Sequence, residues 1–233
     1  ASEVRDYFGT PADKIDVIPN GVDTAPFERW NGVDLTSFRG MYALPEEQIV
    51  FNIGRIVYEK GVHTLVQAAP RVLAQRPDAK FVIAGSGPNL EDLRQLSWNL
   101  GVGPKVLFTG RIPDEDRDRL FKVASCAVFP SLYEPFGIVA LEAMAARCPV
   151  VVSEVGGLKE VVQHAQTGVT VYPGDPESVS WGILHTLQHP EWTALRVENA
   201  YRRVLDEYNW NRIAGLTQRV YERVVAERQR IDW

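Results

Sequence analysis

Residues 49–84 read IVFNIGRIVYEKGVHTLVQAAPRVLAQRPDAKFVIA, and this stretch predicts the fold. Its two ends, 49–53 and 80–84, are short and continuously apolar, as strands buried on both faces of a sheet should be. The residues between them, 61–75, carry apolar side chains at helical spacing. A strand, a helix and a second strand in this order predict a parallel βαβ unit. The helical positions are Val62, Leu65, Val66, Ala69, Val72 and Leu73.

The same alternation continues along the chain. Further continuous apolar runs at 105–109, 126–130, 149–152 and 168–172 predict four more strands. From about residue 174 to 230 the sequence is helical throughout. We therefore predict an α/β fold with a Rossmann-like, doubly wound parallel sheet of about six strands and a helical C-terminal tail.

The first 47 residues have a different character. Ser2–Phe8 resembles the end of a helix, and Lys14–Ile18 resembles a strand that stops at the turn Pro19-Asn20-Gly21. Residues 20–47 lack periodicity and are interpreted as a connection. The chain opens at Ala1 rather than at a Met, as if cut at a domain boundary. We predict an interdomain segment over 1–47 and one domain over 48–233.

Composition and charge exclude several classes of protein. A net charge of −5 with no dominant basic stripe argues against a nucleic-acid binder, so that any phosphate site must be local. No apolar run approaches the roughly 20 residues of a membrane span, and no signal peptide is visible. Cys126 and Cys148 stand in apolar runs and are predicted to be free buried thiols, and the four His are scattered. We expect a cytoplasmic protein without a metal site.

Ligands of open parallel sheets bind at the carboxyl ends of the strands, so the loops after each strand are the candidate sites. The first loop, Gly54–Gly61, brings Arg55 and Lys60 to a helix N-terminus, where added positive charge is unfavourable unless an anion binds. The alternative is that both are solvated loop charges with Glu59 as partner. The loop is not a Walker loop, because the Gly-Lys-Ser/Thr ending is absent.

Two further loops carry glycines. Gly85 in Ala84–Pro88 would permit close backbone approach to a ligand, with Pro88 as the first helical residue, although a tight turn explains the glycines as well. In 153–160, Gly156 and Gly157 open the next predicted helix. A strand–helix turn is the default interpretation there.

The stretch Glu134–Ala146 carries two carboxylates. Glu134 lies in a loop before a helix expected to begin near Phe136, and Glu142 lies on that helix, which is otherwise apolar until Arg147. A helix that is apolar all round is buried, so Glu142 needs a partner, since an unpaired buried charge costs several kcal/mol. A ribose diol and a protein cation would both serve.

These stretches together resemble family 4 of the glycosyltransferases, enzymes of the GT-B fold, over essentially the whole chain. The order and spacing of the motifs carry the resemblance. The segments that match are Val17–Asp23, which joins that family's two domains, Ile53-Gly54-Arg55 with Lys60-Gly61, the Glu134 and Glu142 pair around Pro-Phe-Gly, Gly156–Val162, and Gly174-Asp175-Pro176.

The resemblance implies a role for each matched position. Arg55 and Lys60, with Gly54 in the same clamp, would hold the diphosphate and neutralise the leaving nucleotide. Glu134 would orient the sugar, and Glu142 would bind the ribose diol. Family members transfer sugars with retention and need no essential metal. The remaining positions are Phe136, Gly137 and Ile138, which would offer helix-start amides to phosphate and sugar, Gly85, and Arg111 with Ile112 beside the base.

Within the family, the step from Arg55 to Lys60 and the run Tyr133–Gly137 look closest to glycogen and starch synthases. The donor would then be ADP- or UDP-glucose and the acceptor an α-glucan; mannosyl or other hexosyl transfer to a glycolipid or polysaccharide is the alternative. Arg147-Cys148 departs from the family, which has a glycine there.

The family's acceptor-binding N-terminal domain has no counterpart in this chain. We therefore expect the chain to bind nucleotide but to transfer sugar poorly or not at all. An NAD-binding module is the rival from another enzyme class. It would require a glycine fingerprint after the first strand and an acidic ribose ligand after the second, and the sequence has neither.

Overall fold

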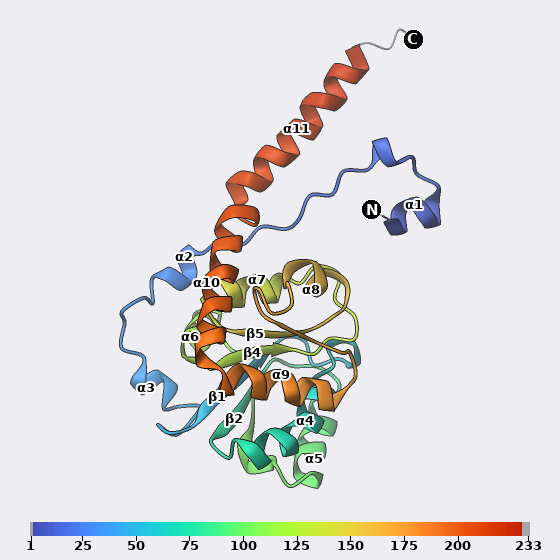
Figure 1. Ribbon diagram of the computed structural model, residues 1–233. Helices are drawn as coiled ribbons and strands as arrows, with labels where there is room; N and C mark the ends of the chain where they lie inside the picture. Colours follow the sequence, from blue (N-terminus) through green and yellow to red (C-terminus); the bar gives the residue numbers. More distant parts are fainter. Residues whose placement is uncertain (1, 230–233) are drawn as a thin grey trace.

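Six parallel strands form one sheet at the centre of the molecule, in the order β3-β2-β1-β4-β5-β6. The computed structural model describes residues 2–229 (Figure 1). The order reverses between β1 and β4, since the chain fills one side of β1 before returning to the other. This confirms the predicted Rossmann-like sheet. The strands are β1 (Gln48–Ile53), β2 (Ala79–Ala84), β3 (Val106–Gly110), β4 (Cys126–Phe129), β5 (Val150–Ser153) and β6 (Val169–Val171).

Helices cover both faces of the sheet because successive strand residues point to opposite sides. Val50 packs with residues of α4 (Val62–Gln75), α5 (Leu90–Asn99) and α9 (Pro176–Gln188). Its neighbour Phe51 packs on the other face. Continuous burial of β1 on both faces explains why its sequence does not alternate. The helices of the Phe51 face are α6 (Asp114–Val123), α7 (Ile138–Ala145), α8 (Gly156–Val161) and α10 (Pro190–Glu207), with the short α2 (Ala25–Glu28) and α3 (Thr36–Arg39).

The N-terminal segment and the last helix lie side by side outside this body (Figure 1). The predicted helical tail consists of α9, α10 and α11 (Trp210–Gln229), and Arg230 lies outside the described residues. The last of these helices projects from the sheet domain beside the segment that carries α1 (Ser2–Phe8) (Figure 1). Arg223 of α11 forms an ion pair with Asp16 of that segment.

The predicted strand over Lys14–Ile18 is wrong. Lys14 ends a short 3₁₀ turn, and the residues after it run extended without a neighbouring strand. Strand propensity alone does not make a strand where no sheet edge is available to pair with it. The apolar side chains of Val17 and Ile18 instead border a small hollow beside α11.

One predicted helix start is confirmed to within two residues, and another is wrong. α7 begins at Ile138, two residues after Phe136, because Gly137 takes a left-handed conformation (φ +73°) that a helix cannot include. α5 begins at Leu90, so Pro88 lies before the helix rather than at its first position. The predicted difficulty at Arg147 is confirmed, since this residue adopts the left-handed conformation with φ +60°.

The sequence's two cysteines, Cys126 and Cys148, are free and buried, as predicted. Burial raises the pKa of the Cys126 thiol to about 12. Along residues 2–229, every helix is too short or too polar to cross a lipid bilayer.

Candidate functional site

A crevice opens where β1 and β4 separate, at the point where the strand order reverses. The two strands pair only through Val50 with Cys126 and Phe51 with Ala127. One residue further, the buried Asn52 side chain bridges them, its Nδ2 donating to the carbonyl of Val128 at 2.7 Å. The Asn52 side chain therefore supplies a hydrogen bond to the carbonyl of Val128, which lies beyond the last residue pair between the two strands. Asn52 was not among the predicted site residues, although it is a lone polar side chain inside the run IVFNI.

The crevice holds a two-part cleft. Its larger part, about 390 Å³, and its smaller part, about 220 Å³, share Ile53, Gly54, Arg55 and Ile112 in their linings. The structure thus brings together residues from loops that are far apart in the sequence. Of the predicted site residues, Gly54, Arg55, Lys60, Ile112, Glu134, Phe136, Ile138 and Glu142 line the larger part, and Gly85 and Arg111 line the smaller one.

Hydrogen bonds join the loops that form the cleft. The amide of Leu132, after β4, donates to the carbonyl of Glu59, after β1, at 2.8 Å. The glycines serve the same close contacts: a Cβ on Gly85 would lie 1.8 Å from the carbonyl oxygen of Gly54. Packing of one loop on another therefore accounts for Gly85 without any ligand. Contacts between the loops therefore hold the walls of the cleft in place.

Two of the cations that line the cleft, Arg55 and Lys60, are in different states. Lys60 Nζ donates to Glu134 Oε2 at 2.6 Å, and the Glu134 side chain is 9% exposed. Lys60 is therefore not a solvated loop charge, and its partner is Glu134 rather than Glu59. Arg55 is exposed, lines both parts of the cleft and forms no ion pair with any residue from 2 to 229. An exposed guanidinium without a partner is available to an anion.

Two helices begin at the cleft without side-chain caps. α4 and α7 start after Gly61 and Gly137, which have φ values of +64° and +73°. The first amides of a helix have no acceptor within it and carry partial positive charge. Val62 and Val139, at these two starts, line the larger part of the cleft. Together with Arg55, the helix starts make this wall suited to a phosphate group.

The carboxylate of Glu142, one turn further along α7, also lines the larger part of the cleft. Arg117 of α6 approaches it, with 3.4 Å between Nη1 and Oε1, and so supplies the protein cation that we considered as one of two possible partners. Burial raises the pKa of Glu142, and the charge of Arg117 opposes that rise. The Glu142 side chain is still 23% exposed toward the cleft, so the ion pair leaves it open to a ligand.

Arg117 is in turn held by a second carboxylate. Its Nε and Nη2 donate to Asp118 Oδ1 at 3.0 and 2.8 Å, and the Asp118 side chain is 2% exposed. Arg29 also donates to Asp118, at 3.3 Å. Sequence reasoning missed Arg117 and Asp118, because the run DEDRDR resembles a solvated helix face.

The smaller part of the cleft is more open. Arg111 is exposed, and its Nε donates to Ser86 Oγ at 3.2 Å. Across residues 2–229, no three His, Cys, Asp or Glu side chains are grouped so as to hold a metal ion. The polar character of the cleft thus comes from Arg55, Lys60, the two helix starts and the carboxylates.

Comparison with known proteins gives a consistent result. Residues 38–203 match the family model described as glycosyl transferases group 1. An uncharacterised glycosyltransferase of Methanocaldococcus jannaschii is 42% identical over 94% of this chain and 57% of its own length. Glycogen synthase of Mycobacterium tuberculosis is 35% identical over 94% of this chain and 51% of its own length. The chain therefore spans about half the length of these curated relatives.

Solved structures share the fold. A protein from Anabaena, crystallised in complex with UDP-glucose, superposes with a TM-score of 0.81 at 25% identity. The superposition covers 95% of this chain and 60% of the Anabaena chain.

Proposed function

Because the chain belongs to the glycosyl transferases group 1 family, we propose that its cleft is the donor site of a retaining hexosyltransferase that uses a nucleoside-diphosphate sugar. One observation carries the proposal: an unpaired guanidinium, two uncapped helix starts and a partly exposed carboxylate converge at the point where the strand order reverses. Positive charge at one end suits a diphosphate, and a carboxylate acceptor at the other suits a ribose diol.

Different residues of the cleft bind different parts of the donor. Arg55 and the amides at the start of α7 hold the diphosphate. Lys60 also binds the diphosphate and retains its hydrogen bond to Glu134, because an ammonium group has three donors. Glu134 orients the transferred sugar through its hydroxyls. As the bond to the sugar breaks, negative charge grows on the leaving diphosphate, and these fixed cations and amides stabilise it. As the family resemblance implies, we propose that the reaction needs no essential metal ion.

The nucleoside lies in the rest of the cleft. Glu142, kept in place by Arg117, accepts hydrogen bonds from the ribose diol. The base occupies the smaller part, beside Ile112 and Arg111. One of the relatives, 35% identical to this chain, is a glycogen synthase. This similarity favours glucose as the transferred sugar and an α-glucan as the acceptor. Transfer of mannose or another hexose is the alternative. The titration described below bears on this choice, because it identifies the nucleotide base that the site prefers.

The acceptor is held by an N-terminal domain of the kind that the family resemblance implies. The present chain then binds nucleotide but transfers sugar poorly or not at all. Vigorous glucosyl transfer by the purified chain from radiolabelled ADP- or UDP-glucose to glycogen would contradict this division. Addition of EDTA is expected to leave nucleotide binding unchanged.

Calorimetric titration with ADP, UDP, GDP and NAD tests the donor site. One nucleoside diphosphate should bind saturably, and Glu142→Ala should weaken it by at least about tenfold, the value of about one charged hydrogen bond. The matched control is Glu91→Ala, an exposed carboxylate on α5 outside the cleft. Arg55→Ala should reduce the affinity for the diphosphate far more than the affinity for the corresponding nucleoside. Binding of NAD alone, or of no nucleotide by the folded chain, would refute the proposal.

A further inference from the structure

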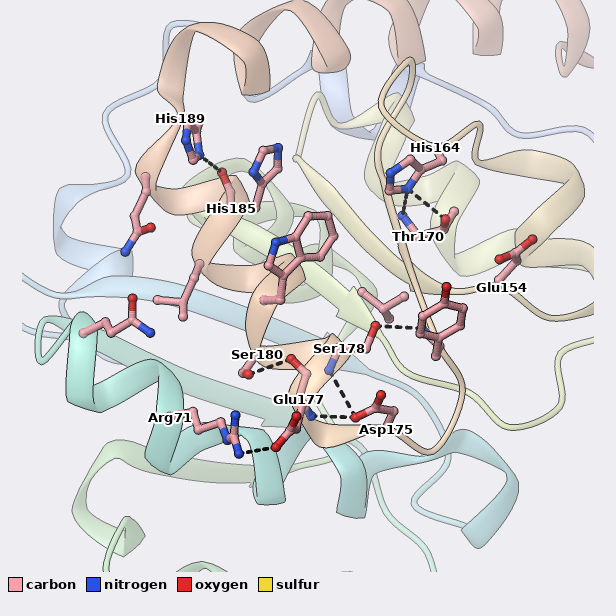
Figure 2. Close-up of a pocket in the computed structure, with 16 residues that line it drawn as sticks. Arg71, Glu154, His164, Thr170, Asp175, Glu177, Ser178, Ser180, His185 and His189 are labelled. Atoms are coloured by element: carbon pink, nitrogen blue, oxygen red, sulfur yellow. Dashed lines mark hydrogen bonds and ion pairs between the residues drawn. The ribbon is translucent and has the colours of Figure 1, made fainter.

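A second hollow, of about 860 Å³, lies away from the cleft, and we call it the α9 hollow. Helix α9, helix α4 and the segment 164–175, which contains β6, form its walls (Figure 2). Its lining shares no residue with either part of the donor cleft. Its volume is within the range of pockets that hold small-molecule ligands. The proposed donor chemistry makes no use of it.

Aromatic rings form a row along one wall of the α9 hollow. Trp181 and His185, four residues apart on α9, share one face of the helix, and His189 follows at the residue just after the helix ends. Their successive ring centroids are 5.1 and 4.5 Å apart, and His164 continues the row at 6.3 Å from Trp181. Trp181 is nevertheless 49% exposed, and Tyr172, on the β6 side, is 68% exposed. The row therefore presents ring surface that the core does not use.

Hydrogen bonds hold two imidazoles of the row in place. The backbone amide of Thr170 donates to His164 Nδ1 at 3.1 Å, so this nitrogen acts as an acceptor (Figure 2). A guanidinium can only donate, and Arg196 donates to His185 Nε2 at 3.2 Å. Burial, together with the charge of Arg196, lowers the pKa of His185. The row thus presents rings fixed by their neighbours, and the lowered pKa of His185 favours the uncharged form of that ring.

The charged side chains of the hollow are already satisfied. Arg71 pairs with Glu177, as Figure 2 shows, and Glu154 pairs with Lys159 at 3.0 Å. Asp175 accepts hydrogen bonds from two amides at the start of α9. Three carboxylates therefore face one arginine, and no free cation is left for a phosphate, a nucleic acid or an acidic lipid surface. The hollow suits a ligand without charge.

Two side-chain amides remain available. Gln75 of α4 and Gln188 of α9 both line the hollow and are exposed, and their side-chain amides form no hydrogen bond with the residues that the structure describes. An amide offers both donors and an acceptor, which matches a hydroxyl group. Stacked rings with polar groups around them suit a pyranose, whose C–H face packs on an aromatic ring while its hydroxyls bind at the edges.

We propose that the α9 hollow is a second carbohydrate site, which binds a neutral oligosaccharide of the α-glucan class with Trp181 and Tyr172 as stacking platforms. The choice of an α-glucan among neutral glycans rests on the proposed function. A site for the polymer apart from the donor cleft holds the enzyme on its acceptor and raises the local concentration of chain ends.

Calorimetric titration of the chain with maltoheptaose tests the proposal. We expect saturable binding that Trp181→Ala weakens by at least about tenfold, with Tyr172→Ala and Gln188→Ala as milder surface variants that do not endanger the fold. The matched control is Trp98→Ala, which removes an equally large ring that is 65% exposed on α5 and should leave binding unchanged. Titration of the same samples with ADP and UDP reports separately on the donor cleft.

The outcomes separate the two proposals. Loss of maltoheptaose binding in Trp181→Ala with intact nucleotide binding supports the second site, and retained maltoheptaose binding without nucleotide binding would refute only the donor assignment. Competition between nucleotide and maltoheptaose, or loss of both in Glu142→Ala, would place the glycan in the donor cleft and overturn the second site. Binding unaffected by Trp181→Ala, or no binding by the folded chain, would overturn it too. So would self-association that depends on Trp181, since it would assign the surface to a second copy.

Discussion

Replacing Arg117 by Met tests the charge arrangement of the cleft. This guanidinium lies 3.4 Å from Glu142 and 2.8 Å from the buried Asp118. At an effective dielectric constant of about 20, opposite charges at 3.4 Å attract by about 5 kcal/mol, and desolvation of both groups offsets part of this. Removing one partner of a buried pair costs about 3–5 kcal/mol.

We expect the variant to lose about 2–3 kcal/mol of unfolding free energy near pH 8, below the full cost for two reasons. Arg29 remains on Asp118 at 3.3 Å, and Glu142 can take up a proton. Met keeps most of the side-chain volume, so the loss reports charge rather than a cavity.

The pH dependence of that loss is the diagnostic result. Burial raises the pKa of Glu142, and Arg117 opposes the rise, so the variant raises that pKa further. A raised carboxyl pKa contributes stability that is fully present below the unfolded-state pKa and is lost as the pH rises through the folded-state pKa. The pH range over which Glu142 makes this contribution therefore extends to higher pH in the variant than in the parent protein. The deficit caused by Arg117→Met should therefore shrink as the pH is lowered from about 8 to about 5.

Urea unfolding at the two pH values measures the deficit directly. Glu142→Gln is the control background, because an amide does not titrate in this range, and there the contribution of Glu142 to the pH dependence of the deficit should disappear. A deficit under about 0.5 kcal/mol, or an equal deficit at both pH values in the presence of Glu142, would refute the reasoning.

Three further substitutions or reagents test the local geometry. Gly137→Ala should destabilise the fold by about 1–2 kcal/mol in urea unfolding and weaken nucleotide binding, because φ is +73° and the new Cβ would lie 3.0 Å from the backbone of Gly157. Arg147→Gly should be about 1 kcal/mol more stable than Arg147→Ala, since both lose the same contacts and only glycine accepts φ +60° without strain; equal stabilities would contradict this. Cys126 and Cys148 should resist a thiol reagent at about pH 8 until urea unfolds the chain, because burial raises the pKa of both thiols; fast labelling of the native protein would argue against it.

The sheet could be predicted from the sequence because burial on both faces leaves a direct trace in it. The continuous runs at 49–53 and 80–84 fall within β1 and β2, and the helix predicted over 61–75 is α4. Elements that depend on a distant partner were less predictable. The run Lys14–Ile18 has strand propensity but no edge to pair with, and the start of α7 depends on the conformation of Gly137.

The site divides in the same way. Loops after strands must meet at one edge of a parallel sheet, so the sequence alone could bring Arg55, Lys60 and Glu134 together. It could not reveal that Lys60 chooses Glu134 over its neighbour Glu59, since that choice depends on how the loops after β1 and β4 pack. The burial of Glu142 could be predicted, but its cation could not, because Arg117 stands in a run that resembles solvent-exposed helix surface.

The histidines show the limit of reading residues by type. The sequence has four His without metal-ligand spacing, yet His185 and His189 stand four residues apart at the end of α9, and His164 lies in the same row from a loop. Helical spacing could have joined the first two, whereas the third depends on where β6 lies at the sheet edge. The rings of the row are stacked, and Trp181 is still 49% exposed, which the core does not require. Aromatic rings that are stacked and yet exposed to solvent are a stronger sign of a binding surface than the identity of any single residue among them.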